Sequence, residues 1–119
     1  MRLEEVDKRE QSYPDTPEER ITRLPVALFN REIGNYCVGA LRKHNCVLSI
    51  APDSYDVFLP EGTTLKEMLP RVMNGRYIVK LPDGFEMEAV YNRHTDLYSL
   101  KMPVSILPEK LQKKYGESW

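Results

Sequence analysis

The stretch that decides the fold is GRYIVKLPDGFEMEAVYNRHTDLYSLKM, residues 75–102. Apolar and aromatic residues alternate in it with charged and polar ones, and this period of two is typical of strands with one buried side. Pro82 and Gly84 suit a three-residue loop, because proline fixes the first turn position and glycine accepts a left-handed backbone. We therefore predict a three-stranded antiparallel meander that forms part of the core. Its expected neighbours are Tyr77–Ala89, Val79–Met87, Leu81–Phe85, Tyr91–Tyr98, Ala89–Leu100 and Met87–Met102 on the buried face, and Lys80–Glu86 and Glu88–Lys101 on the outer face.

A helical period precedes this sheet. Apolar residues recur every three or four positions at Val26, Phe29, Ile33, Tyr36, Cys37, Ala40 and Leu41. Pro25 suits a first helical turn, and the basic run 42–44 suits a last turn, so the pattern predicts a long N-terminal helix. Gly34 and Gly39 each disfavour a helix interior by about 1 kcal/mol. They leave open a later start at Asn30, with the preceding five residues extended.

Three further elements complete the predicted chain. CVLSIAPDSYDVFLP, residues 46–60, reads as two strands around a turn and predicts a β-hairpin. Thr64 and Glu67 then have the spacing of a capping box, which predicts a short helix that ends near Gly75. Pro108 and Gly116 suit the two ends of a C-terminal helix. The order of helix, hairpin, short helix, meander and helix indicates the α+β class.

One segment resembles a known family. YDVFLPEGTTLKEML, residues 55–69, is similar to the passage from the second strand to the helix of β-grasp (ubiquitin-like) domains, where LP-x-G-T-T followed by an apolar residue is common. The resemblance implies a β-grasp-like arrangement over residues 46–102. The chain ends in YGESW rather than in the di-glycine of conjugating carriers, and the resemblance assigns no functional residue.

Charge is balanced over the body of the chain. The 119 residues carry a net charge of −1 and are 41% hydrophobic, which indicates one domain with a packed core. Residues 1–20 hold seven acidic and four basic side chains and predict a flexible acidic arm before a single α+β domain at residues 21–119. Modules that bind nucleic acid usually carry a basic excess, because lysine and arginine contact the phosphates. The balance disfavours binding to nucleic acid or to an anionic membrane.

Cysteine usage and the start of the chain indicate a cytoplasmic protein. The first residues lack the apolar segment of a secretory signal, and no apolar run reaches the roughly 18 residues of a membrane span. The cysteine and histidine side chains lack the paired C-x2-C spacing that is typical of zinc sites. We predict neither a metal nor a cofactor, and the sequence contains no nucleotide-binding or metalloprotease motif. The cysteine and histidine residues considered as metal ligands are Cys37, His44, Cys46 and His94.

Two groups of residues are candidates for a site. Arg93, His94 and Asp96 lie in the loop between two predicted strands, where a histidine near an aspartate could act as a general base. A polar loop tip has the same composition without any activity. The C-terminal helix is basic and ends in the single tryptophan, which favours contact with a partner, although the helix could equally close the open side of the sheet. Its candidate residues are Lys110, Lys113, Lys114, Tyr115 and Trp119.

The leading interpretation is a small non-enzymatic domain that acts by protein–protein contact, as an adaptor, immunity or accessory protein. Its partner would be another protein or a second copy of the chain. One alternative is a nucleic-acid-binding regulator that uses residues 42–44 and the C-terminal lysines, with tyrosines such as Tyr55 stacking on bases. A second alternative is a ligand-binding protein or an enzyme with a pocket near His94. The sequence therefore leaves open whether the protein is an enzyme.

Overall fold

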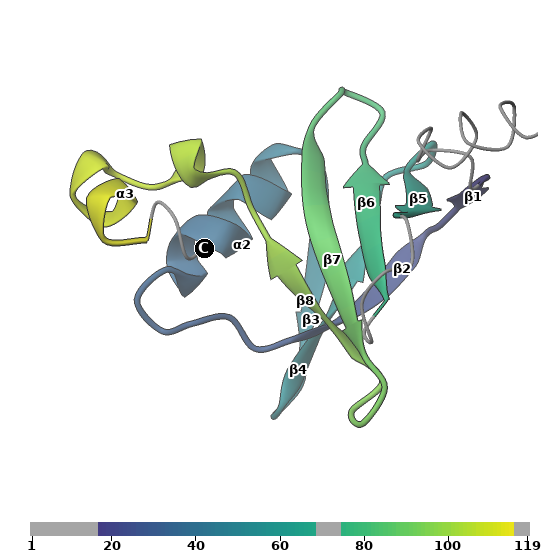
Figure 1. The fold of residues 1–119 in the computed structure, drawn as a ribbon, viewed down its shortest axis with the longest axis horizontal. Helices are drawn as coiled ribbons and strands as arrows, with labels where there is room; N and C mark the ends of the chain where they lie inside the picture. The colour runs from purple at the N-terminus through teal and green to yellow at the C-terminus, as the bar shows by residue number, and fades with distance from the viewer. Residues whose placement is uncertain (1–16, 69–74, 116–119) are drawn as a thin grey trace, which may run out of the picture.

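The computed structural model describes residues 17–68 and 75–115. Within these ranges the chain forms an eight-stranded sheet, two α-helices and a short 3₁₀ helix (Figure 1). The strands are β1 (Glu18–Arg20), β2 (Arg23–Ala27), β3 (Val47–Ile50), β4 (Ser54–Phe58), β5 (Thr64–Glu67), β6 (Arg76–Lys80), β7 (Glu86–Asn92) and β8 (Leu97–Lys101). The helices are α2 (Gly34–Lys43), the 3₁₀ helix η2 (Val104–Ile106) and α3 (Glu109–Tyr115).

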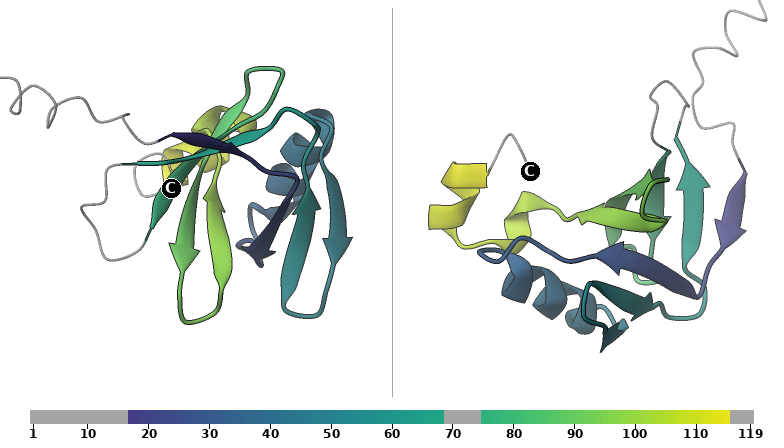
Figure 2. Two further views of the ribbon diagram at one scale, coloured as in Figure 1. Left: turned by 90° about the vertical axis from the view of Figure 1, so that its right-hand side faces the viewer. Right: turned by 90° about the horizontal axis from the view of Figure 1, so that it is seen from below.

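The sheet curls because one bent segment pairs with both outer strands of the four-stranded unit β5 to β8. The strand order is β1-β5-β6-β7-β8-β2-β4-β3, and the neighbours are antiparallel except for β2 and β8, which are parallel. Only Ile21 and Thr22 separate β1 from β2, yet β1 pairs with β5 while β2 pairs with β8. The four strands β5 to β8 are therefore enclosed by a single bent segment (Figure 2). The hairpin of β3 and β4 extends from β2 as the far border of the sheet.

The meander of β6, β7 and β8 has the predicted register. Val79 pairs with Met87, and Tyr91 pairs with Tyr98. The predicted three-residue loop is also present, since the N–H of Leu81 donates to the carbonyl of Phe85 at 2.9 Å. Gly84 has a φ of 97°, which is the left-handed conformation that this loop requires. The alternation of apolar and polar residues thus fixed both the strands and their pairing.

The prediction of a long N-terminal helix is wrong. Residues 23–27 form β2, and the helix α2 is ten residues long. Leu24 and Val26 are both fully buried, so the buried side chains follow the period of two of a strand. The spacing of Val26 to the later apolar residues also fits a helix, which explains the wrong prediction. Pro25 is tolerated in β2 because the amide that proline lacks would point away from β4. It would face β8, which β2 meets only at the bridge of Val26 with Tyr98. The extended alternative before Asn30 is closer to the structure.

The prediction of a short helix that begins near Thr64 is also wrong. Thr64–Glu67 forms β5, which pairs with β1 on one side and β6 on the other. The hydroxyl of the buried Thr63, not that of Thr64, donates to the carbonyl of Pro60 at 2.7 Å, so no capping box forms. Residues 69–74, which include the rest of the predicted helix, lie outside the described residues. A β-grasp-like topology over residues 46–102 needs a helix at this place, where the structure has the strand β5. The prediction of a β-grasp-like topology is therefore wrong as well.

The core lies between the curled sheet and α2, and η2 and α3 pack beside it (Figures 1 and 2). Both the predicted hairpin, β3 with β4, and the predicted C-terminal helix after Pro108 are present. Residues 1–16 of the predicted arm and residues 116–119 lie outside the described residues. The clustered buried side chains are Leu24, Val26, Ile33, Cys37, Leu41, Cys46, Val57, Leu59, Val79, Leu81, Met87, Ala89, Leu100, Met102 and Leu107.

Candidate interaction surface

β3 is a border strand, and one side of its backbone has no neighbouring strand in the described part of the chain. The N–H of Ala51 donates to the carbonyl of Ser54 at 2.8 Å, so the backbone groups of Ala51 point toward β4. Successive residues of a strand direct their backbone groups to opposite sides, so the N–H and C=O groups of Leu48 and Ile50 point away from β4. β3 therefore presents two donors and two acceptors on its open side.

The side chains of the same hairpin are apolar and exposed. Val47 is 64% exposed, Ile50 is 66% exposed and Phe58 is 42% exposed. Val47 and Phe58 are cross-strand neighbours, so their surfaces adjoin. Leu48 is half-buried and packs against the core. We call the open backbone of β3 with Val47, Leu48, Ile50 and Phe58 the β3 edge.

The opposite border of the sheet is different in kind. There β1 has the sequence Glu18-Glu19-Arg20, and all three residues are exposed. Charged residues on a border strand discourage pairing with another chain, because pairing would desolvate them. β3, with the sequence VLSI, is the only one of the eight described strands without a charged residue. In the described sheet, charges therefore protect the border formed by β1 (Glu18–Arg20) from pairing, and we call it the guarded border. The border formed by β3 is open.

A histidine–aspartate contact holds the start of β3 in place. Nδ1 of His44 lies 2.6 Å from Oδ2 of Asp83, and the His44 ring stacks on Phe85 with 4.0 Å between centroids. The contact with His44 and the backbone N–H of Phe85 lower the pKa of the Asp83 carboxyl. Asn45 turns the chain with a φ of 72°, and the N–H of Cys46 donates to the carbonyl of Leu41 at 2.9 Å. The segment that leads into β3 is thus tied to both α2 and the meander.

Some of the predicted C-terminal residues make contacts within the chain, and others are exposed to solvent. Nζ of Lys114 donates to Glu32 at 2.9 Å, and the hydroxyl of Tyr115 donates to the same carboxylate at 2.5 Å. These hydrogen bonds lower the pKa of Glu32 and fix α3 to the loop before α2. Lys110 and Lys113 are exposed. Trp119 lies outside the described residues.

The predicted loop residues Arg93, His94 and Asp96 are also exposed. The N–H of His94 donates to the side-chain oxygen of Asn92 at 2.8 Å. Asp96 accepts a hydrogen bond from the hydroxyl of Tyr91, and this bond raises the pKa of that tyrosine. Arg93 has a contact of its own in the structure. Asp96 is therefore engaged in shaping the turn between β7 and β8.

Both cysteines are buried free thiols. Burial raises the pKa of Cys37 to about 11, and burial together with the charge of Asp83 raises the pKa of Cys46 to about 11. A thiol with such a pKa is almost wholly protonated at neutral pH and is a poor nucleophile. In residues 17–68 and 75–115, no group of three His, Cys, Asp or Glu side chains is placed to hold a metal ion.

Aromatic residues that could have stacked on bases make contacts with one another. Tyr55 stacks on Phe29 with 5.2 Å between ring centroids, and Tyr98 contacts both Tyr77 and Tyr91. All of these rings except that of Phe29 come from strands. These tyrosines are half-buried, so the structure offers no open row of rings in this part of the chain.

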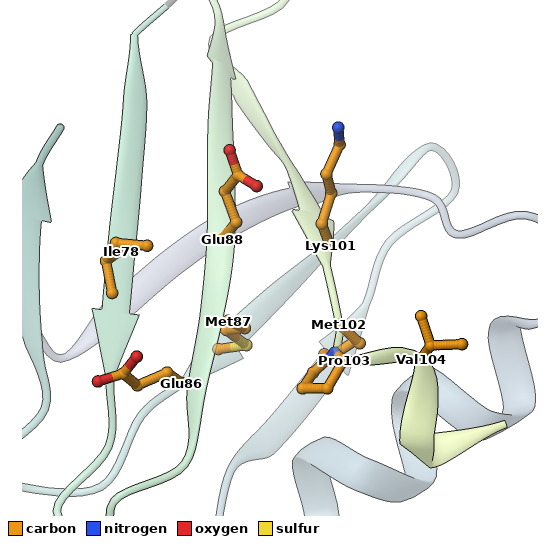
Figure 3. A pocket seen from close by; sticks show the side chains of 8 residues that line it. All are labelled: Ile78, Glu86, Met87, Glu88, Lys101, Met102, Pro103 and Val104. Atoms are coloured by element: carbon orange, nitrogen blue, oxygen red, sulfur yellow. The ribbon is translucent and has the colours of Figure 1, made fainter. Parts of the chain in front are cut away.

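A wide, open hollow of about 380 Å³ lies over the outer side of the meander (Figure 3). The polar side chains at its rim are Glu86, Glu88 and Lys101. Glu88 accepts a hydrogen bond from Nε of Arg76 at 2.7 Å and is thus engaged in an ion pair. The hollow has the form of a surface depression between charged strand residues, and the β3 edge remains the more distinctive surface.

Comparison with protein-family models, with curated proteins and with solved structures gives no match to this chain. Among the described residues, none of the helices has the length and apolar character needed to cross a membrane.

Sequence reasoning missed the residues of the β3 edge, although a signal for them exists. In a strand with one buried side, alternate positions are polar. Val47, Leu48 and Ile50 break this rule, because they place apolar side chains on both faces of a strand that also lies at a border. The composition was readable from the sequence, but the border position became visible only with the strand order.

Proposed function

We propose that this protein acts by protein–protein contact, and that it accepts a β-strand of its partner along the β3 edge. The observation that carries the proposal is the open backbone of Leu48 and Ile50 on a strand without charge. An added strand would complete the hydrogen bonds of both residues, and extended segments commonly bind proteins in this way. The side chains beside that backbone give the contact its apolar component.

The energies involved are sufficient for a specific contact of modest strength. Each new backbone hydrogen bond contributes about 0.5–1.5 kcal/mol net. Complete burial of an isoleucine or valine side chain contributes about 1.5–3 kcal/mol, and Val47 and Ile50 each have about two-thirds of their surface available. These gains act against the loss of translational and rotational freedom on association, so we expect a reversible complex.

Site-specific photo-cross-linking in the cells that produce the protein tests this proposal. A photoreactive amino acid replaces Ser49, which lies in the middle of β3, and in a matched control it replaces Glu18 on the guarded border. We expect a cross-linked protein product from position 49 and none from position 18. Equal yields from both positions, or no product from position 49, would refute the proposal.

A further inference from the structure

We propose that the strand that binds the β3 edge is β3 of a second copy of the chain, paired antiparallel about a two-fold axis at Ser49. This inference rests on the proposed function, and it adds the identity of the partner and the register of the pairing. A two-fold axis requires the same surface on both copies, so the β3 edge must be complementary to itself. Its backbone, its side chains and its flanking charges each meet this requirement.

The backbone selects the axis at Ser49. In this register Leu48 of one copy lies opposite Ile50 of the other, and each such pair exchanges two N–H···O=C bonds. All the donors and acceptors on the open side of β3 are then used. An axis at Leu48 would place Ile50 opposite Cys46, whose N–H already donates to Leu41. An axis at Ile50 would place Leu48 opposite Pro52, which has no N–H.

The side chains agree with this register. Leu48 and Ile50 lie on the same face of β3, so the exposed Ile50 of each copy would meet Leu48 of the other. On the other face Ser49 would meet its own copy, and Val47 would meet Ala51. Apolar side chains thus oppose apolar ones, and no position opposes two like charges.

The charges at the two ends of the strand are also complementary. Arg42 and Lys43 are exposed at the end of α2, just before β3 begins. Asp53 is exposed in the turn just after β3 ends. Antiparallel pairing would bring the acidic turn of each copy beside the basic end of α2 in the other. A parallel arrangement would instead place the two basic ends together.

Strand β3 stands at the outer border of the hairpin in the ribbon (Figure 2). A contact made by one short strand and its flanks is small, and interfaces below about 1,200 Å² in total are typical of weak or transient complexes. We therefore expect the dimer to dissociate on dilution. Its population should depend on protein concentration in the micromolar range or above.

Two measurements on the purified full chain test the inference. Sedimentation equilibrium over a range of concentrations should show a monomer that becomes a dimer. Mild oxidation of Ser49→Cys should then give a disulfide-linked dimer, because residues opposite each other in a non-hydrogen-bonded pair have Cα atoms about 4.5 Å apart, which a disulfide can span. Val47→Cys is the matched control, since its two copies would be more than about 13 Å apart. The wild-type chain controls for the buried native thiols.

Each outcome decides between the two proposals. A dimer that is cross-linked at position 49 and not at position 47 supports the inference. A dimer that is cross-linked at neither position, or at both equally, overturns this register. A chain that stays monomeric, yet cross-links to another protein through position 49 in cells, overturns the second copy as partner and leaves the proposed function standing. A monomer without any such product overturns both.

Discussion

Replacing Ile50 by lysine separates the contribution of the β3 edge to association from its contribution to folding. Ile50 is 66% exposed, so lysine at this position can extend into solvent in the monomer. Surface substitutions of this kind usually change the free energy of unfolding by less than about 0.5 kcal/mol. In the proposed dimer the same side chain would lie against Leu48 of the second copy, where an ammonium group would be desolvated.

The expected size of the effect follows from the exposed fraction. If pairing covers half of the exposed surface of Ile50, each copy buries about a third of a side chain whose full burial contributes about 1.5–3 kcal/mol. The loss is then about 0.5–1 kcal/mol per copy and about 1–2 kcal/mol per dimer. This corresponds to a dissociation constant that is about 5- to 30-fold higher, before any cost of desolvating the two charges.

Sedimentation velocity gives the dissociation constant, and thermal unfolding gives the stability of the same samples. Leu28→Lys is the matched control, because Leu28 is 52% exposed but lies outside the β3 edge. We expect weaker association only for Ile50→Lys, with unfolding unchanged in both variants. If the dissociation constant of Ile50→Lys stays close to that of the wild type, or if Leu28→Lys weakens association as much, the β3 edge is not the surface through which the chain associates.

Three further predictions concern charge, packing and pH. Asp53→Lys should weaken dimerisation severalfold by placing like charges together, and the added change Lys43→Asp should restore it, which sedimentation velocity can measure at low salt. Leu41→Ala should lower the free energy of unfolding in urea by about 2–5 kcal/mol, because Leu41 is fully buried where α2 packs on the sheet. Asp83→Asn should reduce stability at neutral pH by weakening the contact with His44. Because the folded pKa of Asp83 is depressed, its contribution is present above the ordinary pKa of 3.8 and is lost as the pH falls through the folded value, so the two proteins should converge in thermal unfolding below that pH.

The meander could be predicted from sequence because several local signals agree. The alternation of side chains, the loop at 82–84 and the outer charge pairs all require one register. The observed pairs Lys80–Glu86 and Glu88–Lys101 show that this agreement extended to individual residues. Local pairing between consecutive strands needs no information about distant parts of the chain.

The helix predictions failed where distant pairing overrides a local pattern. Val26 fits a helical period with Phe29 and Ile33, yet it is held in β2 by pairing with Tyr55 and Tyr98, which follow it by 29 and 72 positions. Thr64 has the spacing of a helix cap, but it pairs with Arg20 and Lys80 on two sides. A strand between two others gains ladder hydrogen bonds on both sides, and these outweigh small differences in intrinsic propensity.

The same long-range order decides which surface is available to a partner. A single bent segment encloses strands β5 to β8, and this leaves β1 and β3 as the borders of the described sheet. Glu18, Glu19 and Arg20 guard one border, while the other presents open backbone beside Val47 and Ile50. Long-lasting exposure of such a strand to solvent would favour uncontrolled pairing with other chains. A defined partner for β3 would therefore both stabilise the strand and prevent aggregation, and a two-fold dimer would do so with the chain's own β3.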